Sequence, residues 1–359
     1  MRIFHCDSCE QAIYFENVQC VRCGHQLAYL PDVAVMAALE PAGDDLWRPL
    51  GSVANGRAYR LCHHFTVENI CNWAIPADDG EELCSSCRLT RTVPDLSQPQ
   101  HRAAWGALEA AKRRLVYDLL TLGLPLQFNH DGAPIQPIFE FLADGPPGAT
   151  PVKTGHAGGV ITINIAEADD AEREKRRLAM QEPYRTLLGH LRHESGHFYW
   201  DQLIRDREAI QEFRDIFGDE RADYAASLEK HYREGPPADW QNHFVSAYAT
   251  SHPWEDWAET WAHYLHLTDT LDTACECGLT LKTGRSELPA TRPRFSLQDA
   301  AATPFERVIG DWLGVTFLLN NLSRGLGQKD PYPFILSAPA IAKLEFVHRV
   351  CAAVETTKS

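Results

Sequence analysis

The most informative stretch of this chain is Leu191-Arg192-His193-Glu194-Ser195-Gly196-His197-Phe198, at residues 191–198. It contains an HExxH motif, whose two histidines stand four residues apart and would project from one face of a helix. Two neutral imidazoles in this arrangement suit a zinc ion, and the glutamate between them would face the open position of the metal. We therefore predict His193 and His197 as zinc ligands and Glu194 as the base that takes a proton from water.

The residues around the motif favour a helix that begins at Pro183 and runs to about Ile204. Proline suits the first turn of a helix, and apolar side chains recur along the segment at steps of three and four. The pair Ser195 and Gly196 lowers helix propensity, which predicts close packing or access at that point. The alternative interpretation is a buried helix whose two histidines are hydrogen-bonded and bind no metal.

A catalytic zinc also needs a third protein ligand, and a second predicted helix that begins at Pro253 offers one. On this helix Glu255 and Glu259 share one face among several tryptophans, where an unpaired carboxylate would be costly unless it met a cation. We predict Glu255 as the third ligand and Glu259 as the hydrogen-bond partner of a ligand histidine. The alternatives for the third ligand are Asp256, Asp219 and His252.

These two motifs resemble those of the gluzincin peptidases, most closely the lethal-factor type, in which HExxH is followed by ExxAExF. The second pattern is met here by Glu255, Ala258, Glu259 and Trp261, with tryptophan in place of phenylalanine. In that type a tyrosine seven residues before the glutamate ligand faces the reacting carbonyl group. The resemblance therefore implies that Tyr248 stabilises the oxyanion or donates a proton.

Nearly the whole chain also resembles a bacterial family of predicted zinc-binding metallopeptidases with an N-terminal zinc-ribbon region. The runs that carry this resemblance are Cys71-Asn72-Trp73, Cys84-Ser85-Ser86-Cys87-Arg88-Leu89-Thr90, Ile161-Thr162-Ile163-Asn164-Ile165-Ala166-Glu167-Ala168-Asp169 and His252-Pro253-Trp254-Glu255-Asp256-Trp257-Ala258-Glu259-Thr260. It implies an α+β fold, in which a mainly helical zincin-like metallopeptidase domain with a small sheet follows a cysteine-rich zinc-ribbon region. The resemblance does not indicate which substrate the protein acts on.

The first thirty residues contain an independent metal signal. Two CxxC pairs ten residues apart suit a rubredoxin-like zinc ribbon, because each pair sits on a tight turn and four thiolates close a tetrahedron. The predicted ligands of this first structural zinc are Cys6, Cys9, Cys20 and Cys23. So short a segment buries little apolar surface, so the metal would supply its folding energy, and iron is the alternative metal.

A second, looser set predicts another structural zinc. Its ligands would be Cys62, Cys71, Cys84 and Cys87. His63 or His64 could replace Cys62, and the alternative interpretation is four separate buried thiols. The remaining cysteines, which we interpret as ordinary thiols, are Cys275, Cys277 and Cys351.

We expect three units along the chain. Residues 1–32 form the zinc ribbon, residues 33–97 form the second four-cysteine segment, and residues 98–359 form the peptidase domain. Composition marks a linker at 96–100, and periodicity predicts helices over 105–122, 305–322 and 342–354. Two runs are strand-like, 138–142 and 159–165.

The second of these runs bears on substrate binding. Zincin folds place a sheet edge beside the catalytic helix, where an extended peptide can add as a further strand. Gly158 and Gly159 would let a substrate backbone approach closely. The alternative is a core strand with a polar outer face.

The composition of the chain indicates where in the cell the protein is located and which classes of partner it can bind. The sequence is 44% hydrophobic with a formal charge of −15, which argues against nucleic acid as a partner even though zinc ribbons often bind it. No run approaches the length of a membrane span, and no leader with an apolar core begins the sequence, so we expect no membrane partner. Cysteines at metal-ligand spacing suit a reducing compartment, which favours the cytoplasm.

Together these features predict a zinc-dependent peptidase with one catalytic and two structural zinc ions, acting on a peptide or protein. The zinc ribbons could also bind a protein partner. The alternative function is a non-catalytic adaptor or peptide-binding protein with an inactive peptidase domain. A nucleic-acid-binding zinc ribbon is the third class, and the charge disfavours it.

Overall fold

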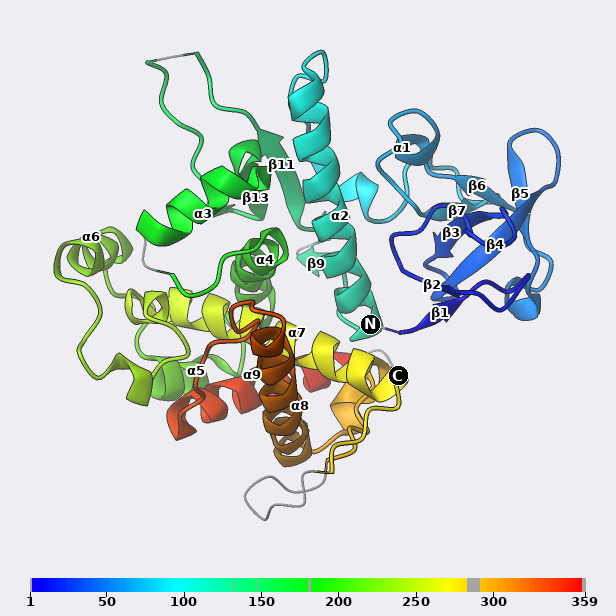
Figure 1. The fold of residues 1–359 in the computed structure, drawn as a ribbon. Helices are drawn as coiled ribbons and strands as arrows, with labels where there is room; N and C mark the ends of the chain where they lie inside the picture. The colour runs from blue at the N-terminus through cyan, green and yellow to red at the C-terminus, as the bar shows by residue number, and fades with distance from the viewer. Residues whose placement is uncertain (1, 131, 147, 180–181, 283–290, 357–359) are drawn as a thin grey trace.

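The computed structural model describes residues 2–130, 132–146, 148–179, 182–282 and 291–356. Figure 1 shows a β-rich N-terminal part on one side of the long helix α2 and a mainly helical part on the other side. The fold is therefore α+β with a cysteine-rich N-terminal region, which confirms the predicted class. Within the described residues, no helix is both long enough and apolar enough to cross a membrane.

The N-terminal part consists of short strands and single helical turns. Its strands are β1 (Phe4–His5), β2 (Ala12–Ile13), β3 (Gln26–Leu30), β4 (Val35–Pro41), β5 (Leu46–Pro49), β6 (Tyr59–Leu61), β7 (Ala74–Pro76) and β8 (Thr90–Thr92). Its helical turns are η1 (Ser52–Ala54), α1 (His63–Thr66) and η2 (Cys87–Leu89).

The remaining chain is richer in helix. Its strands are β9 (Phe128–His130), β10 (Ala133–Ile135), β11 (Ile138–Leu142), β12 (Gly155–Ala157) and β13 (Val160–Asn164). Its longer helices are α2 (Pro99–Thr121), α3 (Asp170–Ala179), α4 (Leu187–Leu203), α5 (Ile210–Phe217), α6 (Tyr224–Glu234), α7 (Pro253–Glu276), α8 (Phe305–Gly325) and α9 (Ala338–Thr356). Its short turns are η3 (Ile165–Ala168), η4 (Trp240–Asn242), η5 (Tyr248–Thr250) and η6 (Leu297–Ala302).

Two sheets pair strands across the predicted unit boundaries. A five-stranded antiparallel sheet has the order β3-β4-β5-β6-β7, so β3 and β4 pair across residue 32. A four-stranded sheet has the order β12-β13-β11-β8, in which β11 runs parallel to both β13 and β8. Because β8 follows the last cysteine of the second set, the cysteine-rich region supplies one edge of the sheet that lies beside the helical part.

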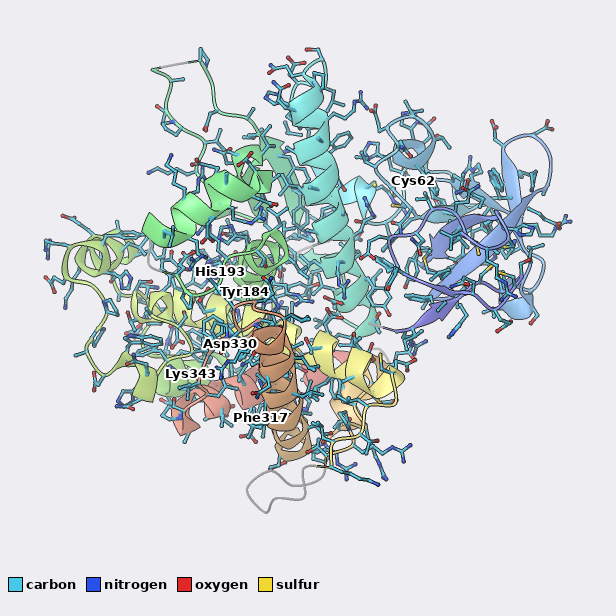
Figure 2. The ribbon with its side chains drawn as sticks, in the orientation of Figure 1. Cys62, Tyr184, His193, Phe317, Asp330 and Lys343 are labelled. Carbon is cyan, nitrogen blue, oxygen red and sulfur yellow. The ribbon has the colours of Figure 1, made fainter. Side chains whose placement is uncertain are left out.

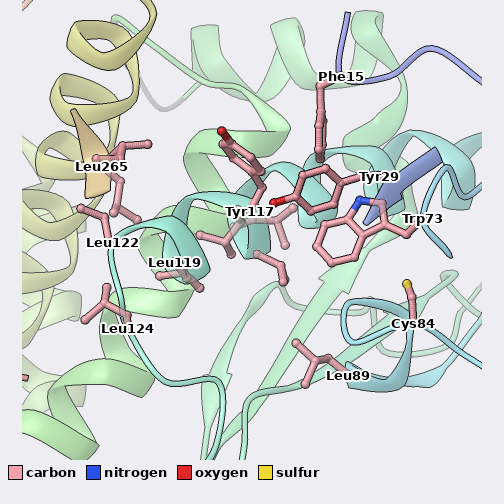
Figure 3. Close-up of a cluster of buried hydrophobic side chains, with 14 of the residues drawn as sticks. Phe15, Tyr29, Trp73, Cys84, Leu89, Tyr117, Leu119, Leu122, Leu124 and Leu265 are labelled. Carbon is pink, nitrogen blue, oxygen red and sulfur yellow. The ribbon is translucent and has the colours of Figure 1, made fainter. Parts of the chain in front are cut away.

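A continuous aromatic core joins the two parts. Phe15, Tyr29 and Trp73 from the N-terminal part pack around Tyr117 of α2, as Figure 3 shows. The ring centroid of Tyr117 lies 5.1 Å from that of Phe15 and 5.5 Å from that of Tyr29. Buried aromatic side chains contribute large apolar areas, so this cluster fixes the N-terminal part against α2.

The two helices that carry the motifs pack closely on each other. Gly196 of α4 faces α7 so closely that a Cβ atom there would lie 3.0 Å from the Cα atom of Ala258. The indole N–H of Trp257 donates to the carbonyl oxygen of Gly196 at 2.9 Å, and that of Trp261 donates to the hydroxyl of Ser195 at 3.1 Å. Close helix packing therefore explains why small residues interrupt the HExxH helix.

Some helix boundaries differ from the predicted ones. Helix α4 begins at Leu187 and not at Pro183, because the hydroxyl of Thr186 accepts a hydrogen bond from the amide of Gly189 and caps the helix there. Helix α2 begins at Pro99, inside the predicted linker, with proline in the first turn. The strand-like run 138–142 is β11, and the run 159–165 contains β13.

Candidate active site

Helices α4 and α7 bring three candidate zinc ligands to one point. His193 and His197 project from α4, and Glu255 projects from the first turn of α7. The Oε2 atom of Glu255 lies 3.0 Å from Nε2 of His193 and 3.5 Å from Nε2 of His197. Ligand atoms in a tetrahedral zinc site stand roughly 3.3–3.6 Å apart, so the distance to His197 lies in this range and the distance to His193 is slightly shorter.

The ionised state of the Glu255 carboxylate also suits the binding of a cation. Its Oε2 atom is buried and has no hydrogen bond within the described structure, although it faces both histidine nitrogens. Burial opposes the charged form, but His197 and His193 outweigh it and hold the pKa of Glu255 well below its usual value. A buried, ionised carboxylate with an unbonded oxygen toward two imidazoles is a donor set that a metal cation would satisfy.

Glu259 holds the ring of His193 from the other side. Its Oε1 atom lies 2.7 Å from Nδ1 of His193, and its Oε2 atom accepts a hydrogen bond from the buried hydroxyl of Ser246 at 2.5 Å. A carboxylate on Nδ1 directs the opposite nitrogen, Nε2, toward the ligand position. The structure thus places Glu259 where the sequence predicted a partner of a ligand histidine, and it adds Ser246.

Glu194 lies beside the ligands without being one of them. It is buried, and its Oε2 atom has no hydrogen-bond partner among the described residues. Burial raises the pKa of Glu194 above its usual value, although His193 and His197 counteract this effect. A carboxylate whose pKa is raised and whose oxygen is unengaged is suited to accept and return a proton near neutral pH.

Two tyrosines approach the same point from different segments. Tyr248 lies on η5, and its ring centroid is 5.9 Å from that of His193. Burial raises the pKa of Tyr248 well above its usual value, so its hydroxyl stays protonated and able to donate. Tyr224, at the start of α6, donates a hydrogen bond from its hydroxyl to Oε1 of Glu255 at 2.6 Å.

The three alternative residues for the third ligand make other contacts. Asp256 is buried against Lys343, with 2.6 Å between its carboxylate and the ammonium group, and Asp219 pairs with Arg221 on the surface. His252 caps α7, because its Nδ1 atom accepts the amide hydrogen of Trp254 at 3.1 Å. Glu255 is therefore the carboxylate that the structure brings to the two histidines.

The sheet presents one edge beside the histidines. This edge is β12 and not the predicted run 159–165, because β13 is flanked by β12 and β11. His156 of β12 stacks on the ring of His197 at 6.1 Å between centroids, and Trp254 packs against the same ring at 4.1 Å. At Gly158, which follows this strand with a φ of 55°, a side chain would meet open space but would strain the backbone.

The first four-cysteine set forms one cluster. The Sγ atoms of Cys6 and Cys23 are 3.6 Å apart, as are those of Cys9 and Cys20. Sulfur atoms in a tetrahedral zinc site stand about 3.8 Å apart, whereas a disulfide bond is about 2 Å long, so the geometry fits a metal. The cluster is half open to solvent through Cys9 and Cys23.

The second set forms a fully buried cluster on the other side of α2 from His193 (Figure 2). The Sγ atom of Cys71 lies 3.8 Å from that of Cys84 and 3.7 Å from that of Cys87. Cys62 completes the group, and its sulfur accepts the amide hydrogen of Cys84 at 3.4 Å. The alternatives His63 and His64 lie outside the group, and the ring of His64 packs instead on Trp105.

A buried cation faces the second cluster. Arg113 of α2 is only 6% exposed, and burial opposes its charge. The nearby Cys71, Glu109 and Cys87 nevertheless raise the pKa of Arg113, so it stays charged. Four thiolates around a zinc ion carry a net charge of about −2, which this guanidinium partly offsets.

Two families of known proteins match adjoining parts of the chain. Residues 101–350 match the family described as "Putative zinc-binding metallo-peptidase", and residues 3–98 match a family described as a zinc-ribbon domain. The chain belongs to this zinc-binding metallopeptidase family, with a zinc-ribbon domain at its N-terminus. The predicted resemblance to such a bacterial family is confirmed, whereas the similarity to lethal-factor-type gluzincins stays a prediction.

Mycobacterial relatives cover nearly the whole chain. Uncharacterised proteins of Mycobacterium tuberculosis (strain ATCC 25618 / H37Rv) and Mycobacterium bovis (strain ATCC BAA-935 / AF2122/97) are each 40% identical over 351 residues, which is 98% of this chain and 95% of the relative. No solved structure matches the chain. These relatives therefore support the family assignment, and their descriptions do not name a substrate.

Proposed function

We propose that this protein hydrolyses peptide bonds with a zinc ion held by His193, His197 and Glu255. The observation that carries the proposal is the position of Glu194. Its buried carboxylate has an unbonded oxygen, and it interacts electrostatically with all three convergent metal donors, His193, His197 and Glu255. A purely structural metal site needs no such carboxylate, because it closes its fourth position with another ligand.

Each residue then has a defined task. A zinc ion, when bound, supplies a Lewis acid that polarises the peptide carbonyl and acidifies water. Glu194 accepts the proton of the attacking water and passes it to the leaving amine, a contribution of about 10²–10⁴ in rate. Tyr248 keeps its hydroxyl proton and donates a hydrogen bond to the oxygen that gains negative charge.

The substrate we propose is an extended stretch of a peptide or protein. The edge strand β12 lies beside the ring of His197 through His156, so a peptide added to this edge would run past the ligand histidines. An extended chain can pair its backbone with such an edge at little steric cost. The zinc ribbons remain a candidate surface for a protein partner.

We also propose two structural zinc ions in the cysteine clusters, in addition to the catalytic one. The sulfur spacings of 3.6–3.8 Å support a tetrahedral metal in both clusters. Because thiolate sites of this kind persist in reducing surroundings, we propose the cytoplasm as the location.

A cleavage assay tests the proposal. Unfolded proteins and peptide mixtures would be incubated with the wild type, with the wild type plus a zinc chelator, and with Glu194→Gln, and products read by mass spectrometry. We expect cleavage by the wild type alone, and we expect Glu194→Gln to retain its zinc. Cleavage that persists in Glu194→Gln would contradict the role of this residue, and binding without cleavage by the wild type would favour the adaptor function.

A further inference from the structure

Tyr224 touches the candidate zinc ligand Glu255 from a helix that the sequence motifs do not include. We infer that Tyr224 is a positioning residue, whose hydroxyl holds Oε1 of Glu255 so that Oε2 alone is offered to the metal. This inference rests on the proposed function, because it concerns the same metal site.

The two oxygens of Glu255 have different surroundings. Oε1 accepts the phenolic hydrogen of Tyr224 at 2.6 Å, whereas Oε2 has no hydrogen bond in the described structure and faces the histidine nitrogens at 3.0 and 3.5 Å. A phenol–carboxylate hydrogen bond is charge-assisted and therefore stronger than a neutral one. It fixes the carboxylate plane and occupies the oxygen that could otherwise also approach the cation.

Apolar packing contributes little to the position of α6, the helix that carries Tyr224, because none of the residues of α6 is buried. The ring of Tyr224 packs edge-on against His252 at 5.2 Å and Trp254 at 5.7 Å, the residues near the start of α7 that precede Glu255. Tyr224 itself is 37% exposed, so its role is more specific than filling a core.

Further contacts of α6 also converge on this site. His231 lies 6.0 Å from the ring of Tyr248 and 3.2 Å from the hydroxyl of Thr250. Tyr232 lies on the same helix, and its hydroxyl hydrogen-bonds with Tyr248, whereas its interaction with Glu255 is electrostatic and without a hydrogen bond. Tyr224 is thus the residue through which α6 contacts a candidate metal ligand directly.

Metal binding tests this role without any substrate. The wild type, Tyr224→Phe and Tyr232→Phe would be treated with a chelator that empties the histidine site but leaves zinc in the cysteine clusters. Zn²⁺ affinity would then be measured by competition, and the visible absorption of the site loaded with Co²⁺ would be recorded. Partners that orient metal ligands typically change affinity by roughly 10- to 100-fold.

We expect Tyr224→Phe to bind Zn²⁺ at least about 10-fold more weakly than the wild type and to show an altered Co²⁺ spectrum, with Tyr232→Phe close to the wild type. Equal affinity and an equal spectrum in Tyr224→Phe would overturn the inference and leave the proposed function standing. Loss of zinc from the cysteine clusters of Tyr224→Phe would also overturn it, because Tyr224 would then act on folding. A wild type that binds no metal outside the cysteine clusters would refute the proposed function itself.

Discussion

Replacing Gly196 with alanine tests how the packing of α4 on α7 supports the metal site. The added Cβ atom would lie 3.0 Å from Cα of Ala258 and 3.2 Å from Cβ of Trp261. Carbon atoms prefer about 3.5–4.0 Å, so both contacts are repulsive. Because the nearer contact is to backbone, no side-chain rotation can relieve it, and the two helices must move apart.

The cost can be worked from three contributions. Overpacking of this kind costs about 1–3 kcal/mol. Strain on the hydrogen bond from Trp257 to the carbonyl of Gly196 adds about 1 kcal/mol, whereas the better helix propensity of alanine returns about 1 kcal/mol. We therefore expect Gly196→Ala to lower the free energy of unfolding by about 1–3 kcal/mol. In a chain of 359 residues, each kcal/mol corresponds to a Tm lower by about 1–2 °C.

The same movement should weaken metal binding, because His193 and His197 lie on α4 and Glu255 lies on α7. Thermal and urea unfolding, together with Zn²⁺ affinity, would measure both effects. Gly310→Ala is the matched control, since Gly310 is an exposed helical residue of α8 with no atom within 4 Å of an added Cβ. That variant should be more stable by up to about 1 kcal/mol. If Gly196→Ala were as stable as the control and bound zinc as tightly, close packing of α4 on α7 would not be what supports the metal site.

Three further predictions follow from the site and its surroundings. Tyr248→Phe should lower kcat by about 10²–10³ at unchanged zinc content, and an unchanged rate in a peptide assay would remove Tyr248 from the mechanism. Burial lowers the pKa of His263 to about 4, so the unfolded chain binds a proton first and stability should fall as pH drops below about 6.5. His263 should contribute up to about 1.4 kcal/mol per pH unit to the slope measured by urea unfolding, so His263→Gln should have a shallower slope than the wild type; parallel slopes would contradict this. A chelator should release zinc from the histidine site first, then from the half-exposed cluster with Cys9 and Cys23, and last from the buried cluster. Simultaneous release from all three sites would show that burial does not protect the zinc of the second cysteine cluster.

Local spacing predicted much of the candidate site. His193 and His197 stand one helical turn apart, so any helix over this stretch aligns their rings, and the structure does bring both to Glu255. The cysteines of a CxxC pair stand three positions apart, and the two pairs of the first set close on a common centre once each pair forms a tight turn. The strand β13 was predictable because Ile161 and Ile163 alternate with Thr162 and Asn164, a period of two that a half-buried strand leaves in the sequence.

Contacts between distant segments left no comparable signal. Tyr224 reaches the candidate ligand Glu255 from a short exposed helix, and Ser246 reaches Glu259 from a stretch without regular structure. Neither residue belongs to a repeating pattern. The edge strand β12 is only three residues long and begins at Gly155, so its pairing with β13 could not be inferred from propensity. Likewise, nothing in the residues of β8 indicated that a strand beside the second cysteine cluster would pair with β11.

The number of zinc ions per chain, measured by elemental analysis on the wild type and on His197→Ala, tests most directly whether the histidine site holds a metal. We expect about three zinc ions in the wild type and about two in the variant, because the cysteine clusters keep theirs when the histidine site is lost. The same zinc content in both proteins would contradict this expectation, since His193, His197 and Glu255 would then hold no metal.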